Sequence, residues 1–432
     1  MISEPGGATV GLRPGAAAKS GSAPLTIRIL LLLLALIAAG LYVRSTSRAY
    51  RAYQWARNFT PENLKTAARL EPSNAEFRYR LGRYSLLMQD FPGAIVDLKA
   101  AIALDPYDAR FWLDLASANL ATDNHAQTQQ ALAQAMEADP TTPEVVWQTA
   151  NYELVQGETD LALRRFHDLV ENDQETLLAV LNVCWRATHD ADLIAEKVLP
   201  ARPDDYFTFI HFLWNKRSPL AADKVWSHLI ALRRPFAVTL AFPYIDQLIG
   251  RGELEQATEA WAQLAAANPE LHPYVPTEDR IVNGGFELDL LNGGLDWRYS
   301  PQQGASVIID DRRAHSGERS LAITFEGTPA DCGVVQLVPV RGNTHYQFSA
   351  FVMTEDLETV SPPRFAIYGV TRNQQYLLTD GVTRAPGWHE LQGEFTTGPQ
   401  ADLLLVRIAR VPSQRQIRGT VWVDDVHLVP KS

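Results

Sequence analysis

Cysteine is almost absent from this chain of 432 residues, which contains only Cys184 and Cys332. The two fall in different predicted domains, which excludes both a disulfide framework and a zinc site built on cysteines. Basic charge is scarce as well, because the net charge is −11 and no basic face is concentrated in the sequence. A nucleic-acid partner is therefore not expected, since the phosphate backbone demands such a face.

Catalytic motifs are also missing. The sequence has no HExxH, GxSxG, Walker A or GxGxxG pattern, and its ten histidines are scattered without ligand spacing. The doublets Asp310-Asp311 and Asp424-Asp425 do not make a glycosidase pair, because neighbouring residues on a strand point to opposite faces. We predict that the protein is not an enzyme.

The N-terminal region changes character abruptly. Residues 1–24 are rich in Gly, Ala, Ser and Pro and are predicted to form a disordered tail. The uncharged run from Ile29 to Val43 follows, bracketed by Arg28 and Arg44, which lie about 24 Å apart on a helix and can snorkel to the surfaces of a bilayer. We predict a single-pass transmembrane anchor at residues 25–47, with a buried core helix or a cleaved signal segment as the alternatives.

Charge does not decide the orientation of this anchor. Three basic residues precede the run and four follow it closely: Arg13, Lys19 and Arg28, then Arg44, Arg48, Arg51 and Arg57. A short cytoplasmic tail with an exported C-terminal portion is the commoner arrangement for one N-terminal anchor. The bulk of the chain is therefore expected on the periplasmic side.

A repeat of 34 residues follows, punctuated by Pro72, Pro106 and Pro140. Small and large apolar residues recur at fixed offsets in the unit that begins at Ala75: Leu81, Gly82, Ala94, Leu98, Ala101 and Pro106. The next unit keeps five of these six positions, and the pattern fades beyond residue 175. This pattern resembles the tetratricopeptide repeat (TPR) and predicts an α-solenoid of helix pairs over residues 48–272.

The resemblance implies a concave groove lined by the first helix of each pair, which in this family receives a protein partner segment. Among the residues at groove positions, the candidates for partner binding are Tyr79, Arg83, Arg110, Trp147 and Asn151. An alternative remains open for Tyr79 and Trp147, which would then pack between repeat units.

Helical periodicity stops at a predicted linker, residues 273–279, and short alternating segments with turns between them follow over 280–432. They predict an antiparallel β-sandwich. Three landmarks in order, Asn283–Glu287, His315–Leu321 and Val423–Val426, resemble the jelly-roll carbohydrate-binding modules of families 4, 9 and 22. The fold class is thus multidomain α and β.

The second resemblance also implies a structural calcium ion held by Glu287 and Asp424, together with backbone carbonyl groups. Calcium prefers six to eight hard oxygen ligands, and adjacent carboxylates repel one another without a cation. The alternative is that both carboxylates are simply solvated. No other cofactor is expected.

Sugar recognition needs exposed aromatic rings and polar side chains. Trp297, Trp388 and Trp422 match positions that mostly fill the sandwich core in these families. The candidates that could face a cleft are Tyr299, Arg364, Tyr368, Arg372, Asn373 and Tyr376.

These inferences combine into a membrane-anchored, non-enzymatic scaffold of the bacterial cell envelope. The repeats recruit a protein partner, and the sandwich binds a glycan in the synthesis or export of a surface polysaccharide. The alternative is a scaffold for protein assembly whose sandwich binds no sugar.

Overall fold

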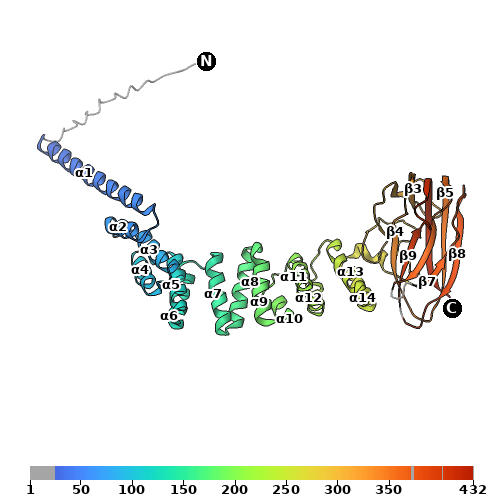
Figure 1. Ribbon diagram of the computed structural model, residues 1–432, viewed down its shortest axis with the longest axis horizontal. Helices are drawn as coiled ribbons and strands as arrows, with labels where there is room; N and C mark the ends of the chain where they lie inside the picture. Colours follow the sequence, from blue (N-terminus) through green and yellow to red (C-terminus); the bar gives the residue numbers. More distant parts are fainter. Residues whose placement is uncertain (1–24, 371–373, 401, 432) are drawn as a thin grey trace, which may run out of the picture. The chain divides into compact units, whose positions relative to one another are not determined.

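The computed structural model describes residues 25–370, 374–400 and 402–431 (Figure 1). The predicted tail, residues 1–24, and two glycan candidates, Arg372 and Asn373, lie outside the described residues. The chain divides into two compact units, Met1–Gln156 and Gly157–Ser432.

The first helix, α1 (Leu25–Ala56), is 32 residues long and runs past the predicted end of the anchor at residue 47. Its apolar N-terminal part is exposed, whereas Ala52 and Ala56 are buried. These two alanines pack with Leu64 and other residues of α2 (Pro61–Leu70). The helix that carries the apolar run therefore also supplies one partner of the first helix pair.

Helix pairs continue through the first unit as the repeat predicts. They are α3 (Ala75–Leu87), α4 (Phe91–Leu104), α5 (Ala109–Ala121), α6 (His125–Ala138) and α7 (Pro143–Gln156). Asn74, Asp90 and Asp108 cap the starts of α3, α4 and α5 by accepting backbone N–H bonds. Gly82 lets α4 approach α3, since a methyl group on Gly82 would lie 2.6 Å from Leu98 Cγ. The small side chain at position 82 therefore allows the short distance between α3 and α4.

The second unit begins with further helices, including the region after residue 175 where the repeat pattern weakens. They are α8 (Thr159–Asn172), α9 (Leu177–Thr188), α10 (Ala191–Lys197), α11 (Pro203–Asn215), α12 (Pro219–Ala231), α13 (Phe242–Gly250) and α14 (Leu254–Ala267). Three 3₁₀ turns accompany them: η1 (Gln174–Thr176), η2 (Val238–Ala241) and η3 (Pro269–Tyr274). The predicted helical fold of the middle region is confirmed.

The C-terminal part forms two five-stranded antiparallel sheets. Sheet A has the order β1-β4-β9-β6-β7 and sheet B the order β2-β3-β10-β5-β8. The strands are β1 (Arg298–Tyr299), β2 (Ala305–Asp310), β3 (Ser320–Pro329), β4 (Val334–Val340), β5 (His345–Thr359), β6 (Arg364–Gly369), β7 (Gln374–Leu378), β8 (His389–Thr396), β9 (Asp402–Ala409) and β10 (Gln416–Pro430). The predicted β-sandwich is confirmed.

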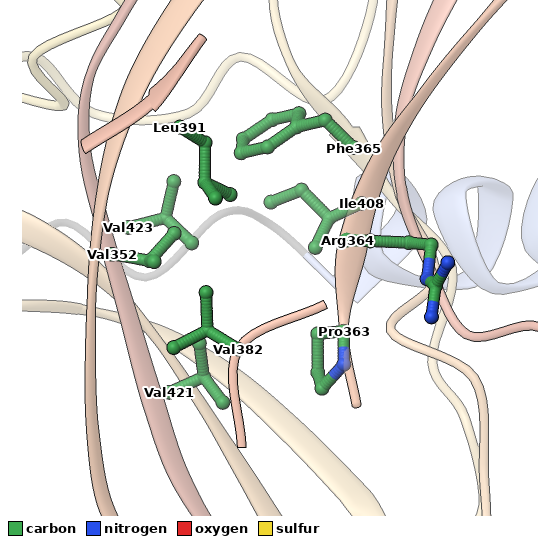
Figure 2. Close-up of a pocket in the computed structure, with 9 residues that line it drawn as sticks. All are labelled: Val352, Pro363, Arg364, Phe365, Val382, Leu391, Ile408, Val421 and Val423. Atoms are coloured by element: carbon green, nitrogen blue, oxygen red, sulfur yellow. The ribbon is translucent and has the colours of Figure 1, made fainter. Parts of the chain in front are cut away.

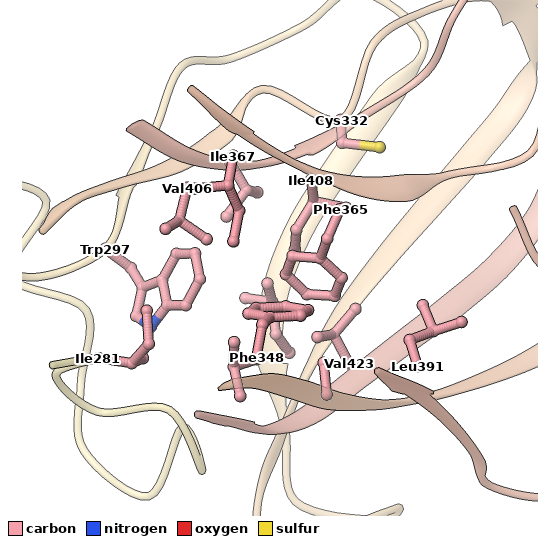
Figure 3. Packing of buried hydrophobic residues seen from close by; sticks show 14 of the residues in the cluster. Ile281, Trp297, Cys332, Phe348, Phe365, Ile367, Leu391, Val406, Ile408 and Val423 are labelled. Carbon is pink, nitrogen blue, oxygen red and sulfur yellow. The ribbon is translucent and has the colours of Figure 1, made fainter. Parts of the chain in front are cut away.

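The core of the sandwich lies between the two sheets and contains large apolar side chains such as Trp297, Phe348 and Phe365 (Figure 3). The prediction that Trp297 fills this core is confirmed. It is wrong for Trp388 and Trp422, which belong to a smaller cluster with Ala322 and Met353. Trp422 lies between the core residues Val421 and Val423 on β10, so alternation turns its ring to the opposite face of sheet B.

The segment predicted as a linker is fixed by hydrogen bonds. The Trp261 indole donates to the Tyr274 carbonyl (2.9 Å), and the Tyr274 hydroxyl donates to the Asp289 carbonyl (2.7 Å). Asp279 accepts backbone N–H bonds from Ile281 and Leu428, 3.0 Å each. These bonds connect α14, the segment and strand β10.

Candidate functional sites

The predicted groove face of the first unit is built around Tyr79 on α3. Its ring is buried, with 6% exposure, and its centroid lies 4.6 Å from that of Phe111 on α5. Burial and the neighbouring Asp114 carboxylate raise the pKa of Tyr79 above its usual range. Tyr79 therefore packs between successive units, in agreement with the packing alternative.

Two exposed arginines cover this aromatic pair. The guanidinium carbons of Arg83 and Arg110 lie 5.9 and 5.3 Å from the Tyr79 centroid, within cation–π range. Arg83 Nε lies 3.5 Å from Asp114 Oδ2, and Arg110 Nη2 lies 2.6 Å from Asp108 Oδ2. Burial raises the pKa of Asp114. The arrangement presents ordered guanidinium groups on an aromatic base.

Trp147 and Asn151 both lie half-buried on α7. The Asn151 amide nitrogen donates to the Trp147 carbonyl at 2.8 Å, so this donor is already engaged within its own helix.

Sequence reasoning missed Phe111 and Asp114, which fall outside the family's groove positions. The signal for Asp114 was a carboxylate inside the apolar segment FWLDLA.

The carboxylates predicted to hold calcium lie near each other beside Gly285. A methyl group on Gly285 would lie 3.9 Å from both Asp424 Oδ1 and Glu287 Cγ. Glu287 Oε1 accepts the N–H groups of Glu318 and Arg319, at 2.9 and 3.1 Å. Glu287 thus binds one end of the loop 315–319, and Asp424 binds the other end.

Asp424 is fully buried, and its Oδ2 accepts the N–H groups of His315 and Ser316, at 2.7 and 3.3 Å. Burial raises its pKa. No group of three or more His, Cys, Asp or Glu side chains in the described part of the chain is arranged to hold a metal. Backbone N–H groups already donate to Glu287 Oε1 and to both carboxylate oxygens of Asp424. Calcium binding at Glu287 and Asp424 stays a prediction.

The expectation that Asp424 and Asp425 point to opposite faces is wrong. Asp425 Oδ2 lies 2.6 Å from His315 Nδ1, and Asp425 Oδ1 accepts the Ser316 hydroxyl at 2.8 Å. A register irregularity follows Asp424, and Asp425 has a φ of 46°, so strict alternation breaks down there. Both carboxylates consequently hold the loop at His315.

The predicted glycan-binding residues do not lie together on one face of the sandwich. Arg364 and Tyr368 take the same side of β6 as Ala366, opposite the core residues Phe365 and Ile367. Tyr376 turns inward, with its centroid 5.3 Å from that of Phe395. Tyr299 is paired with the buried Val334 at the edge of sheet A and keeps 37% exposure. The outward candidates among the described residues are thus Arg364 and Tyr368.

Two further arginines lie on the outward side of sheet A and were missed from sequence. Arg407 on β9 lies opposite Ala366 in the register, and Arg298 on β1 lies opposite Val335. Arg407 Nη2 is 2.6 Å from Asp331 Oδ2, and Arg298 Nη2 is 2.5 Å from Asp246 Oδ1. Alternation within LLLVRIAR was the available signal for Arg407.

Two segments of the chain match known protein families. Residues 278–413 match the carbohydrate binding domain family, and residues 85–150 match the tetratricopeptide repeat family. Both resemblances predicted from sequence are therefore confirmed. No curated protein matches the chain.

Solved structures similar to parts of the chain include both kinds of module. The CBM22-1 xylan-binding domain of Paenibacillus barcinonensis Xyn10C is 16% identical, covering 34% of this chain and 91% of that domain, with a TM-score of 0.25. The TPR2B domain of yeast Sti1, solved in complex with pHsp70, is 20% identical, covering 27% of this chain and 97% of that domain, with a TM-score of 0.26. A MamA protein is 16% identical, covering 44% and 92%, with a TM-score of 0.28. At these scores the similarities carry no argument about ligands.

The family matches suggest protein–protein interaction through the repeats and carbohydrate binding through the sandwich. Both matched families are binding modules, without a catalytic domain. Within the described residues, α1 is the one helix long and apolar enough to cross a membrane, and a signal sequence near the N-terminus would have the same properties.

Proposed function

We propose that this protein is a membrane-anchored, non-enzymatic binding protein of the bacterial cell envelope, with most of its chain on the periplasmic side. Its repeats recruit a protein partner, and its sandwich binds a glycan during synthesis or export of a surface polysaccharide. The observation that carries the proposal is the presence of both binding modules behind one exposed apolar helix. The step from these folds to a shared role is an analogy between modules.

The anchor is supported by the exposure of the apolar part of α1. Leu30, Leu33 and Leu36 are 53 to 68% exposed, and burying such side chains in lipid is favourable. A reporter enzyme fused after Ser432 tests the orientation. Activity of a periplasm-dependent reporter supports export, and activity of a cytoplasm-dependent reporter alone overturns it.

Glycan binding is tested with the full-length chain in lipid nanodiscs on a broad glycan array, with and without calcium. Retention of a defined glycan supports the proposal. An array without binding in either condition overturns the role of the sandwich as a sugar-binding module.

A second candidate function is a scaffold for protein assembly without sugar binding. The inward orientation of Tyr376 and the edge position of Tyr299 favour it, because stacking on sugar rings needs exposed aromatic faces. Tyr368 is the described tyrosine candidate with an outward position. The array separates the two functions, since the assembly scaffold would bind none of its glycans while still binding its protein partner.

A further inference from the structure

The outward side of sheet A carries charged side chains of one sign. Its outward strand positions alternate with the core positions of β4, β6 and β9. Among the described residues at these positions, the charged side chains are Arg298, Arg364 and Arg407, and no Asp or Glu occupies one. Two of these arginines are paired with aspartates that lie outside these strand positions, Arg298 with Asp246 and Arg407 with Asp331, and Arg364 has no such partner among the described residues.

Strand pairing brings two of these arginines together with a tyrosine around one small residue. Ala366 on β6 lies opposite Arg407 on β9, and Arg364 and Tyr368 lie two residues to either side of Ala366. Diagonal neighbours on one face of a sheet are within about 7 to 8 Å and within reach of long side chains. The methyl group of Ala366 is buried, so a ligand would contact the three longer side chains around it.

The two guanidinium groups differ in their pairing. Arg407 is held at one end by Asp331 and keeps 35% side-chain exposure. The side chain of Arg364 makes no hydrogen bond or ion pair among the described residues, and its Nε is buried without a partner. Figure 2 shows the Arg364 side chain pointing away from the small apolar cavity between the sheets.

A half-buried arginine whose Nε has no acceptor is unusual, because loss of water contacts at a charged donor costs free energy unless another acceptor replaces them. A carboxylate is the matching acceptor, since its two oxygens fit the planar fork of arginine. Arg364 therefore lacks the partner that Asp331 supplies to Arg407.

We propose that the outward side of sheet A binds an acidic glycan, with the carboxylate of a uronic acid residue held by Arg364 and Arg407 and its ring lying against Tyr368. This inference rests on the proposed function, because it names the class of sugar for the same sandwich. The Tyr368 ring supplies the apolar contact, and the arginines supply selectivity for charge.

The experiment uses full-length protein in lipid nanodiscs and three probes: polygalacturonate, alginate and hyaluronan, each compared with its carboxyl-reduced, neutral form. Affinity is measured by isothermal titration calorimetry at two salt concentrations. We expect at least one acidic polymer to bind about tenfold or more tightly than its neutral form, since a charge-assisted hydrogen bond accounts for at least that factor. Its affinity should fall as salt rises.

Variants locate the site. Arg364→Gln should weaken binding of the acidic polymer about tenfold or more, whereas Arg364→Lys, which keeps the charge but loses the fork, should weaken it less. The matched control is Arg418→Gln, the same change at an exposed position of β10 in sheet B, which should leave binding unchanged. Thermal unfolding confirms that each variant is folded.

The outcomes separate this inference from the proposed function. Equal binding of acidic and neutral polymers overturns the inference and leaves glycan binding intact. If binding requires the carboxylates of the polymer but is unchanged in Arg364→Gln, the assigned location is wrong. Absence of binding to all six polymers overturns the inference, and the broad glycan array then decides separately whether the sandwich binds other sugars.

Discussion

Gly294 lies directly against the ring of Trp261, so that a methyl group on Gly294 would overlap the six-membered part of the indole. Trp261 is a fully buried residue of α14 at a helix position that the repeat pattern specifies, whereas Gly294 belongs to the loop before β1. This contact and the ion pair between Arg298 and Asp246 join the last helix pair to the sandwich. The two modules are thus packed together at this point of the chain.

The substitution Gly294→Ala should destabilise this junction by about 2 kcal/mol or more, because it overpacks the Trp261 contact and places a side chain at a φ of 60°. Urea unfolding followed by tryptophan fluorescence measures the loss. Gly250→Ala is the control, since no atom lies within 4 Å of a methyl group there. Equal stability of the two variants would show that the junction is not closely packed.

Asp296 should make the stability of the second unit depend on pH. Burial raises its pKa to about 7 from a usual value of 3.8, and its Oδ1 has no hydrogen-bond partner. The folded state therefore holds this proton more tightly than the unfolded state. The resulting stabilisation is complete below about pH 4 and is lost as the pH rises towards 7.

Asp296→Asn removes the titrating carboxyl group. Between pH 5 and pH 8 the free energy of unfolding of this variant should therefore fall less than that of the natural protein. The difference is expected to reach roughly 2 kcal/mol, measured by urea unfolding at several pH values. Asp311→Asn, at an exposed aspartate, serves as the control. Parallel curves for the natural protein and Asp296→Asn would contradict the assignment.

Calcium should raise the thermal unfolding temperature of the full-length protein if Glu287 and Asp424 hold an ion, and EDTA should lower it again. In Glu287→Gln the response should disappear, although the amide oxygen can still accept the N–H groups of Glu318 and Arg319. Differential scanning calorimetry provides the measurement. An unfolding temperature that responds to neither reagent removes the calcium site.

The groove prediction is tested by photo-crosslinking in the native cell. A crosslinking amino acid at Arg83, which is 56% exposed in its side chain on the groove face, should form a defined adduct with the protein partner. The same amino acid at Val96, which is 68% exposed on α4, should not. Identical adducts from both positions, or none from Arg83, would argue against partner binding in this groove.

Much of the fold was predictable because local patterns carry it. Gly82 and Leu98 recur at offsets that let paired helices approach, and the structure shows the close contact that requires a glycine there. The alternation in β4 likewise places Val334 and Val338 in the core. Fading of the repeat after residue 175 did not change the fold, since helix pairs continue there.

The candidate sites were less predictable, because they depend on which strands become neighbours. Arg364 was predicted from sequence and Arg407 was not, since their meeting around Ala366 requires β6 to pair with β9. Tyr376 was predicted to face a cleft, yet an irregularity in the β6–β7 pairing accompanies its turn toward Phe395. Register shifts of this kind reverse the side that a side chain takes.

The sequence by itself determined the order of modules: an apolar helix, repeated helix pairs and a jelly-roll sandwich. Periodicity and side-chain size act over a few turns or strands, and each segment of the chain records them directly. Only the tertiary structure decided that Asp424 and Asp425 turn to one loop and that Trp422 leaves the core. It also decided that Arg364 stands without a carboxylate partner among the described residues. The reason is that strand order, bulges and long-range contacts bring together residues separated by tens to more than a hundred positions, and no local pattern encodes that proximity.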